Sequence, residues 1–227
     1  MKWLKIVVFL YITITMYADC KNYTKHKRWE QISNQRIFSV SGLVHHKNGF
    51  LIIHDNKKDN QPRISFFKNN KISPLIWPDS SLPYDLEAIS IIPSFKNQYI
   101  LMESTGKCYK IKIEQRNNQI TLMNIFQLET NEDMNLEGCI IVKGNFGYKI
   151  MYGDRGSDLR KSTLFIGDFN PIDNNITNLV KHMIDLPAPG EHKRNIADLG
   201  IDKKIIYGHP QLQILGTMVL LRPLFIN

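Results

Sequence analysis

Acidic side chains recur along this chain next to a short repeated phrase, and they are the residues best suited to chemistry. The three instances are Asp85-Leu86-Glu87-Ala88-Ile89, Asn135-Leu136-Glu137-Gly138-Cys139 and the looser Asn195-Ile196-Ala197-Asp198-Leu199. Carboxylates that converge repel one another, so a cation must accompany them, and oxygen ligands favour Ca²⁺ over zinc or copper. The repeat therefore predicts a calcium site made by Glu87, Glu137 and Asp198. The alternative is that each carboxylate caps a turn or pairs with a neighbouring Lys or Arg.

The spacing of the phrase indicates which elements would bring these carboxylates together. An earlier version, Ser41-Gly42-Leu43-Val44, precedes the other three, and the intervals of roughly 45 to 60 residues match a four-stranded propeller blade. The innermost strand of each blade lines a central channel, so side chains at the start of these strands meet at one mouth. We therefore predict an all-β, β-propeller-like fold that is incomplete, with about four blade-like units of antiparallel strands.

Short apolar or alternating segments between Asn, Gly, Lys and Asp support the all-β prediction, and no long segment has a helical period. The clearest predicted strands are residues 49–54, 63–67, 87–92, 98–102, 108–113, 119–127, 138–142, 148–152 and 163–168. Turns are predicted at 68–70, 116–118 and 173–175, each of which holds two adjacent asparagines. His45 and His46 lie in a polar stretch and are expected to be solvated.

Several phrases resemble bacterial propeller proteins of the phytase-like esterase group and, more distantly, the SdiA-regulated family. They are SGLV followed by a strand ending in HDN, DLEAISI, NLEGC, and YGDRG followed by LFIGDF, within Phe38 to Gly208. The resemblance implies an exported propeller with a polar central pocket and esterase-like or phytase-like activity. It also nominates residues around that pocket. They are Glu87 and Glu137 in the phrase, and Asp55, Asn56, Glu103, Asp154 and Arg155 where the following strands end.

The first functional hypothesis is metal-assisted hydrolysis of phosphate or carboxylic esters, with a small-molecule ester as substrate. A Ca²⁺ ion held by Glu87, Glu137 and Asp198 would polarise the ester oxygen or activate water. Arg155 would bind the developing anion, unless it forms an ion pair with Asp154 or Asp158. His54 next to Asp55 suggests a base with its orienting carboxylate, but adjacent strand residues point to opposite faces, which disfavours a direct relay.

The second hypothesis is a non-catalytic module that binds a ligand or an envelope component. Tyr84, Trp77 and Tyr109 would supply aromatic contacts, or else they pack between blades. Enzymatic activity is thus an open question at the level of the sequence.

The N-terminal residues 1–20 are typical of a signal peptide. Lys2 and Lys5 precede an apolar run from Ile6 to Tyr17 that is short for a membrane span. We expect a secreted or periplasmic protein, and an uncleaved N-terminal segment as membrane anchor is the alternative.

Charge and cysteine content limit the classes of partner. The formal net charge is +8, but Lys and Arg are scattered rather than gathered on one face, so no nucleic-acid partner is indicated. The sequence specifies no oligomeric state. Cys108 and Cys139 either form a disulfide or remain two buried thiols.

The final segment, 209–227, differs from the rest of the chain. It is apolar where the propeller-like residues 30–208 are rich in Asn, Asp, Lys and Gly. Codons compatible with this segment can spell a Gly/Asp/Pro-rich loop in another frame. We therefore expect a frameshifted tail and a product truncated at its C-terminus, which would be inactive if its ring cannot close. The alternative is a last strand or helix of the fold.

Overall fold

Three four-stranded antiparallel sheets form most of the molecule. The computed structural model describes residues 31–114, 116–157, 160–184, 196–201, 213–215 and 218–221. The first sheet has the order β1-β2-β3-β4, the second β5-β6-β7-β8 and the third β12-β11-β10-β9. Their bounds are β1 Gly42–His46, β2 Gly49–Ile53, β3 Ile64–Lys68, β4 Lys71–Pro74, β5 Leu86–Ile91, β6 Gln98–Glu103, β7 Lys107–Ile113, β8 Ile120–Gln127, β9 Leu136–Gly144, β10 Gly147–Asp154, β11 Ser162–Phe169 and β12 Ile176–Ile184. Each sheet is thus a meander, like one propeller blade.

A fourth, smaller sheet follows and departs from this pattern. It contains β13 (Asp198–Ile201), β14 (Gln213–Leu215) and β15 (Met218–Leu221), in the order β13-β15-β14. Strand β15 runs antiparallel to β14 but parallel to β13. Strand β13 therefore lies where a fourth blade would begin, whereas its partner β15 comes from the apolar segment 209–227.

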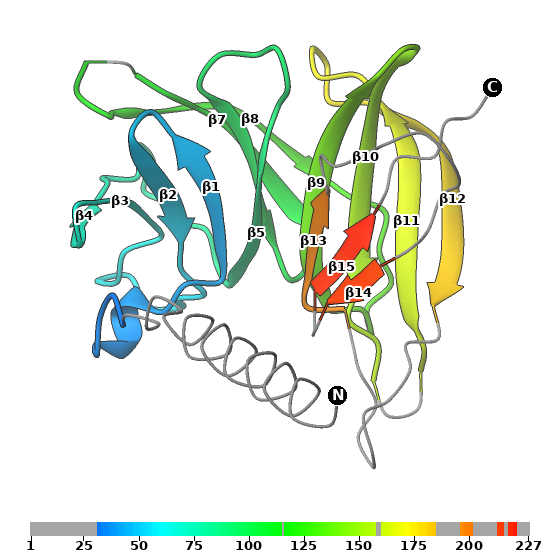
Figure 1. Ribbon diagram of the computed structural model, residues 1–227, viewed down its shortest axis with the longest axis horizontal. Coiled ribbons are helices and arrows are strands. Elements are labelled where there is room, and N and C mark those ends of the chain that lie inside the picture. Colours follow the sequence, from blue (N-terminus) through cyan, green and yellow to red (C-terminus); the bar gives the residue numbers. More distant parts are fainter. Residues whose placement is uncertain are drawn as a thin grey trace, which may run out of the picture. The chain divides into compact units, whose positions relative to one another are not determined.

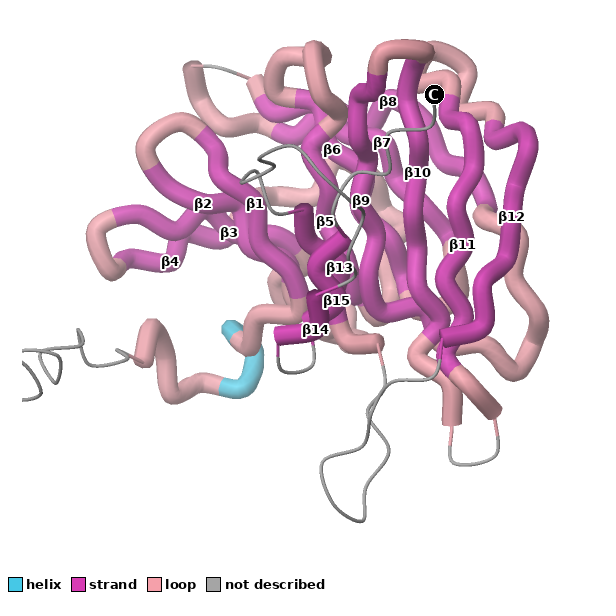
Figure 2. Tube along the Cα trace, turned by 45° about the vertical axis from the view of Figure 1, so that its right-hand side comes forward, coloured by secondary structure: helices cyan, strands magenta, loops and turns pink. Residues whose placement is uncertain are grey.

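The first strands of the four sheets lie against one another in sequence order. Strand β5 contacts both β1 and β9, and β13 contacts β9. Figure 1 shows these inner strands side by side, with the later strands of each sheet turned away from them, and Figure 2 shows the same succession from another side. We use the term inner strands for β1, β5, β9 and β13. The arrangement confirms an all-β, blade-like and incomplete propeller fold, and the described strands do not close a ring.

Hydrophobic side chains fill the spaces between consecutive sheets. One cluster joins the first and second sheets and is centred on Leu51, Leu101 and Tyr109. A second joins the second and third sheets, and Tyr152 and Phe165 stack in it with ring centroids 4.6 Å apart. A small third cluster contains Ile196 and Leu199 beside the third sheet. Because each sheet covers a face of the next, the inner strands are held in a fixed register.

Local sequence explains where the strands end. Asn69 and Asn70 both adopt the left-handed conformation, with φ of 49° and 57°, in the turn between β3 and β4. Two such residues are what a tight hairpin turn requires, and asparagine tolerates them better than most residues. Asn118 and Asn174 also have positive φ. The predicted turns at 68–70, 116–118 and 173–175 are confirmed in this way.

The nine predicted strands are confirmed to within two residues at their ends, whereas β1, β4, β12, β13, β14 and β15 were not among them. Cys108 and Cys139 are free and buried, so the alternative of two thiols is confirmed. The described residues hold a single short 3₁₀ helix, η1 (Arg36–Phe38), and among them no helix has the length and apolarity needed to cross a bilayer.

The chain divides into two compact units, Met1–Ile32 and Ser33–Asn227, and all the strands belong to the second. The predicted signal at 1–20 lies outside the described residues and stays a prediction, as does most of 209–227.

Candidate active site

Two glutamates occupy equivalent bulges at the start of neighbouring inner strands. In the second sheet Leu86 pairs with Glu103 and Ala88 with Met102, so Glu87 is an extra residue in β5. In the third sheet Leu136 pairs with Asp154 and Gly138 with Gly153, which leaves Glu137 as the extra residue in β9. A bulge bends the strand and changes the direction of one side chain, and such features are common beside functional sites.

The other two inner strands carry no glutamate at this position. Gly42 and Gly138 are equivalent, because each faces a backbone nitrogen of the next inner strand. A Cβ on Gly42 would lie 3.3 Å from the Ile89 nitrogen, and one on Gly138 would lie 2.8 Å from the Leu199 nitrogen. Glu137 directly precedes Gly138, so Ser41, which directly precedes Gly42, takes the glutamate position in the first unit. Ile89 and Leu199 likewise correspond, so Ala197 takes the glutamate position in the fourth unit.

Asp198, predicted as the third metal ligand, is therefore one residue out of register with Glu87 and Glu137. Its carboxylate lies near Cys139, and burial together with the charge of Asp198 raises the pKa of that thiol to about 12. Burial also raises the pKa of Asp198 itself, although its Oδ1 accepts a bond of 2.7 Å from the Leu199 N–H.

The two glutamates influence each other electrostatically. Burial, followed by the charge of Glu137, raises the pKa of Glu87 to about 8. Asp85 and Asp55 add smaller effects of the same sign, and Lys57 opposes them. We call Asp55, Asp85, Glu87 and Glu137 the acidic cluster. At neutral pH its most perturbed member, Glu87, keeps its proton.

Three members of the acidic cluster each have a cation of their own. Arg36 binds Asp55 with both guanidinium nitrogens, at 2.9 and 2.7 Å. Lys57 Nζ lies 3.0 Å from Asp85 Oδ2, and Arg155 Nη1 lies 3.2 Å from Glu137 Oε1. Glu87 forms no ion pair or hydrogen bond with any residue that the structure describes. An unpaired, half-buried carboxyl among other acids is most stable when neutral, which accounts for its raised pKa.

Glu137 has a more polar environment than Glu87. Besides Arg155, the Asn135 side chain donates a bond of 2.9 Å to Glu137 Oε1. Burial raises the pKa of Glu137, while the charge of Arg155 and its hydrogen bond lower it. The pair thus contains one glutamate with a fixed cation and one without, and this separates their affinities for a proton. The sequence alternatives paired Arg155 with Asp154 or Asp158. The first is corrected, because Arg155 pairs with Glu137 and Asp154 with Arg160, whereas Asp158 lies outside the described residues.

Asp154 and Glu103 have structural roles at the end of the second strand of their sheets. Glu103 is 5% exposed and its Oε1 accepts bonds from the Tyr84 N–H at 2.7 Å and the Tyr109 hydroxyl at 2.5 Å. Asp154 is fully buried, accepts a bond of 3.1 Å from the Asn135 N–H, and forms an ion pair with Arg160. Both carboxylates fix the chain just before an inner strand, and so they position Glu87 and Glu137.

Asp55 and Asn56 hold the chain that precedes the first sheet. Ser39 Oγ donates to Asp55 Oδ1 at 2.8 Å, and hydrogen bonding to Arg36 lowers the pKa of Asp55. Asn56 is buried and its amide donates to the carbonyls of Ile37 and Pro62 at 2.8 and 2.7 Å. Asn56 therefore has its donors occupied within the fold, whereas Asp55 belongs to the acidic cluster.

The histidines do not form a catalytic relay in the described structure. His54 contacts the Ser39 carbonyl at 2.7 Å and Ser65 Oγ at 2.9 Å, while Asp55 binds Arg36, so the expected separation of His54 and Asp55 is confirmed. His46 was expected to be solvated, and this is wrong. It is buried, contacts the Tyr99 hydroxyl at 2.6 Å, and burial lowers its pKa to about 4.

Of the three aromatic candidates, only Tyr84 is exposed near the acidic cluster. Trp77 and Tyr109 are buried and pack edge to face with centroids 5.4 Å apart, as the packing alternative expected. Lys57 Nζ lies 5.4 Å from the centroid of Tyr84, next to Asp85. Tyr84 is thus available to a ligand.

Sequence reasoning missed Asp85, Lys57 and Arg36 as members of this site. Asp85 was part of the repeated phrase, and its positive φ of 59° places its carboxylate beside Ser104 Oγ, at 2.9 Å. Lys57 and Arg36 lie in irregular segments whose course depends on tertiary structure, and no local pattern identifies them.

The acidic cluster was also compared with the predicted calcium site. Among the residues that the structure describes, no group of three or more His, Cys, Asp or Glu side chains is arranged to hold a metal ion. The cluster as it stands offers Glu87 and Glu137 as a pair, with Asp85 and Asp55 engaged by cations. The calcium site therefore stays a prediction.

No protein-family model matches the chain, and no curated protein matches it with significant similarity.

Proposed function

We propose that the chain hydrolyses phosphate or carboxylic esters at the acidic cluster. The observation that carries this proposal is the unequal pair of glutamates, since Glu87 has a pKa of about 8 and forms no ion pair with a described residue, whereas Glu137 is bound by Arg155. Two carboxyl groups with separated proton affinities are the usual arrangement for acid–base catalysis at neutral pH.

In this proposal Glu87 is the general acid and Glu137 is the general base. The carboxylate of Glu137 takes a proton from water, and the resulting hydroxide attacks the phosphorus or carbonyl carbon. The bond to the leaving oxygen breaks as Glu87 gives that oxygen its proton. Products are an alcohol and an acid, and proton exchange with solvent restores both glutamates.

Nearby cations suit a substrate that is negative or becomes so during the reaction. Arg155 and Lys57 side chains are 54% and 51% exposed, so each can bind an anion with the donors that their ion pairs leave free. Hydrogen bonds to developing negative charge contribute strongly to hydrolysis when the donors are already in place. Arg155 keeps the anion-binding role that we expected of it, now next to Glu137.

The test is hydrolysis of p-nitrophenyl acetate and p-nitrophenyl phosphate by the full chain across pH 5 to 10, with added Ca²⁺ and with chelator. We expect kcat/KM to decline as the pH rises past about 8, where Glu87 loses its proton. Glu87→Gln and Glu137→Gln should each lower kcat by about a hundredfold or more. Glu129→Gln, which alters an exposed ion pair with Lys181, is the matched control and should be unchanged.

Two results would contradict the proposal. One is turnover that survives in both glutamine variants, because another site would then be responsible. The other is absence of turnover with either ester, with or without Ca²⁺. Turnover that requires Ca²⁺ and depends on both glutamates would place a metal ion in the same pair.

A second candidate function is ligand binding without catalysis, and Tyr84 favours it. Tyr84 is 53% exposed next to Lys57 and Asp85, so an aromatic surface and a charged pair lie together at the edge of the acidic cluster. Tyrosine and other aromatic side chains are enriched at recognition surfaces. This function is favoured if p-nitrophenyl phosphate binds in a Tyr84-dependent way without being hydrolysed.

A further inference from the structure

A concave site lies at the opposite end of the strands from the acidic cluster. It has a volume of about 320 Å³. Its apolar lining consists of Phe95, Phe146, Tyr148, Phe169, Pro171 and Ile172, which we call the aromatic groove. Glu137 is near the start of the nine-residue β9 and Phe146 follows its end, so roughly 25 Å of strand separates the two sites.

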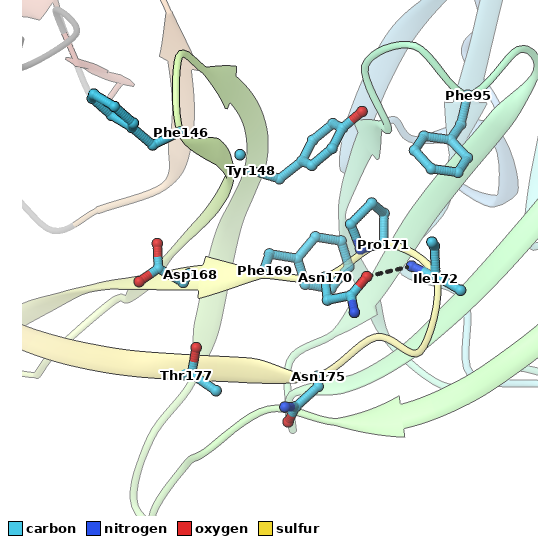
Figure 3. Close-up of a pocket in the computed structure, with 11 residues that line it drawn as sticks. Phe95, Phe146, Tyr148, Asp168, Phe169, Asn170, Pro171, Ile172, Asn175 and Thr177 are labelled. Carbon is cyan, nitrogen blue, oxygen red and sulfur yellow. Dashed lines mark hydrogen bonds between the residues drawn. The ribbon is translucent and has the colours of Figure 1, made fainter.

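Three loops of two sheets build the aromatic groove. Phe95 belongs to the connection between β5 and β6, Phe146 to the turn between β9 and β10, and Pro171 to the connection between β11 and β12. Figure 3 shows the Tyr148 ring directed toward Phe95. Pro171 lies between these two rings on one side and Phe169 on the other. The Phe95 and Tyr148 centroids are 5.9 Å apart at an interplanar angle of 62°. Phe95 and Tyr148 therefore fix the positions of each other's rings in the groove.

The outer part of the groove exposes apolar side chains that the fold does not cover. Phe146 is 94% exposed and Ile172 is 78% exposed. Phe169 and Pro171 are buried beneath them. Small-molecule sites are concave, mostly apolar, and roughly 300 to 1,000 Å³ in volume, with a few polar groups that set orientation. The size and lining of this groove suit one ring system.

The charges around the groove select the ligand. Lys143 Nζ lies 5.8 Å from the Tyr148 centroid and donates a bond of 3.2 Å to Ser94 Oγ, a neutral partner. Lys110 Nζ lies 5.8 Å from the Phe95 centroid and donates to the Pro171 carbonyl. Neither ammonium forms an ion pair with a carboxylate of the described residues.

The single carboxylate of the groove lining is already neutralised. Asp168 Oδ1 lies 2.6 Å from Lys149 Nζ, and Asp168 Oδ2 accepts a bond of 2.8 Å from the Asn178 amide. These contacts lower the pKa of Asp168. Lys110 and Lys143 are not part of the groove lining, but they lie beside its Phe95 and Tyr148 rings. With Asp168 compensated by Lys149, their charges make the surroundings of the groove net positive.

We propose that the aromatic groove binds a small anion that carries a ring, of the aryl carboxylate class. The ring stacks among Phe95, Tyr148 and Phe146, and the carboxylate faces Lys143, whose flexible ammonium has donors to spare. Lys110 lies deeper and contributes positive potential without leaving the Pro171 carbonyl. This binding is independent of the hydrolysis proposed at the acidic cluster.

The test is a calorimetric titration of the full chain with 2-naphthoate and with its neutral analogue 2-naphthylmethanol. We expect naphthoate to bind about tenfold more tightly, and Lys143→Gln to remove that preference. Phe146→Ser and Ile172→Ser should each weaken both ligands several-fold. Met183→Ser is the matched control, because Met183 is a similarly exposed apolar residue, at 79%, on β12 away from the groove.

Each outcome bears on the proposal directly. Equal affinity for the two probes, or affinity unchanged by both Phe146→Ser and Ile172→Ser, would overturn it. Naphthoate binding that is lost in Glu87→Gln would also overturn it, since the anion would then be at the acidic cluster. Binding that persists in Glu87→Gln and fails in Phe146→Ser supports the groove whether or not the chain hydrolyses esters.

Discussion

Glu87 and Glu137 occupy equivalent bulges on adjacent inner strands, yet Arg155 binds Glu137 and no cation of the described residues binds Glu87. The fold therefore places two chemically identical groups in unequal environments. Asp85, which Lys57 pairs with, does not create the difference, because its charge raises the pKa of both glutamates, whereas Arg155 lowers the pKa of Glu137. Unequal proton affinity is a consequence of the position of one arginine.

The first prediction concerns the pH dependence of stability. The pKa of Glu87 is about 8 in the folded chain, compared with an ordinary value of 4.5. Between these values the folded chain holds a proton that the unfolded chain has lost, so the free energy of unfolding falls as pH rises, by up to about 1.4 kcal/mol per pH unit. Above pH 8 no further loss from this group is expected.

Glu87→Gln should flatten this pH dependence, because glutamine resembles the protonated acid. Denaturant melts from pH 5 to 9 measure it: the variant should match the parent near pH 5 and exceed it near pH 8.5. Glu114→Gln, which removes an exposed carboxylate paired with Lys112, serves as control and should leave the slope unchanged. An equal slope in parent and Glu87→Gln would show that Glu87 ionises normally.

The second prediction contrasts a buried ion pair with an exposed one. Asp154 is fully buried and is bound by Arg160 and by the Asn135 N–H. Asp154→Asn removes the buried charge and leaves Arg160 paired only with the exposed Asp133, and we expect the free energy of unfolding to drop by about 2 kcal/mol. Glu129→Gln disrupts the exposed pair with Lys181 and should cost about 0.5 kcal/mol. Urea melts compare the two, and similar losses would mean that Asp154 does not hold the strand.

The repeat of the phrase predicted the acidic position well because it reflects the geometry of the blade. Each inner strand begins at the same place relative to its neighbours, so a recurring Leu-Glu must recur in space. The prediction was least accurate for Asp198, where the phrase is looser. Ala197 takes the glutamate position there, and one residue of shift sends the carboxylate toward Cys139.

Other parts of the site depend on contacts between distant segments, and no local pattern encodes them. Arg36 reaches Asp55 from the segment before the first strand, at 2.7 Å. His46 appeared to be in a polar turn, but Tyr99 from the next sheet covers it and bonds to it at 2.6 Å. Burial by a neighbouring blade also distinguishes Glu103 and Asp154, which hold the chain, from Glu87 and Glu137, which face the site. Sequence patterns alone treat these four carboxylates alike.

The third prediction concerns the two thiols in the hydrophobic cluster between the second and third sheets. Burial raises the pKa of both Cys108 and Cys139, so little reactive thiolate forms at pH 8. In a Cys20→Ser background we expect Ellman's reagent to label neither thiol in the native protein over minutes, and both in guanidinium chloride. Rapid native labelling of either cysteine would indicate that the sheets separate readily.

The fourth prediction tests how the last unit packs against the third sheet. Gly138 lies so close to β13 that an added Cβ would stand 2.8 Å from the Leu199 nitrogen and 2.9 Å from the Asp198 carbonyl carbon. These are backbone atoms, so relief of the clash requires the inner strands to move apart, and we expect Gly138→Ala to lower the free energy of unfolding by about 1 to 3 kcal/mol.

Gly144 is at the other end of the same strand, where an added Cβ would meet its nearest atom at 3.9 Å. Gly144→Ala is therefore the matched control and should change stability by less than about 0.5 kcal/mol. Thermal melts of both variants give the comparison. Equal stability of the two would mean that β13 does not press on β9, and the register that gives Ala197 the glutamate position in the fourth unit would have to be revised.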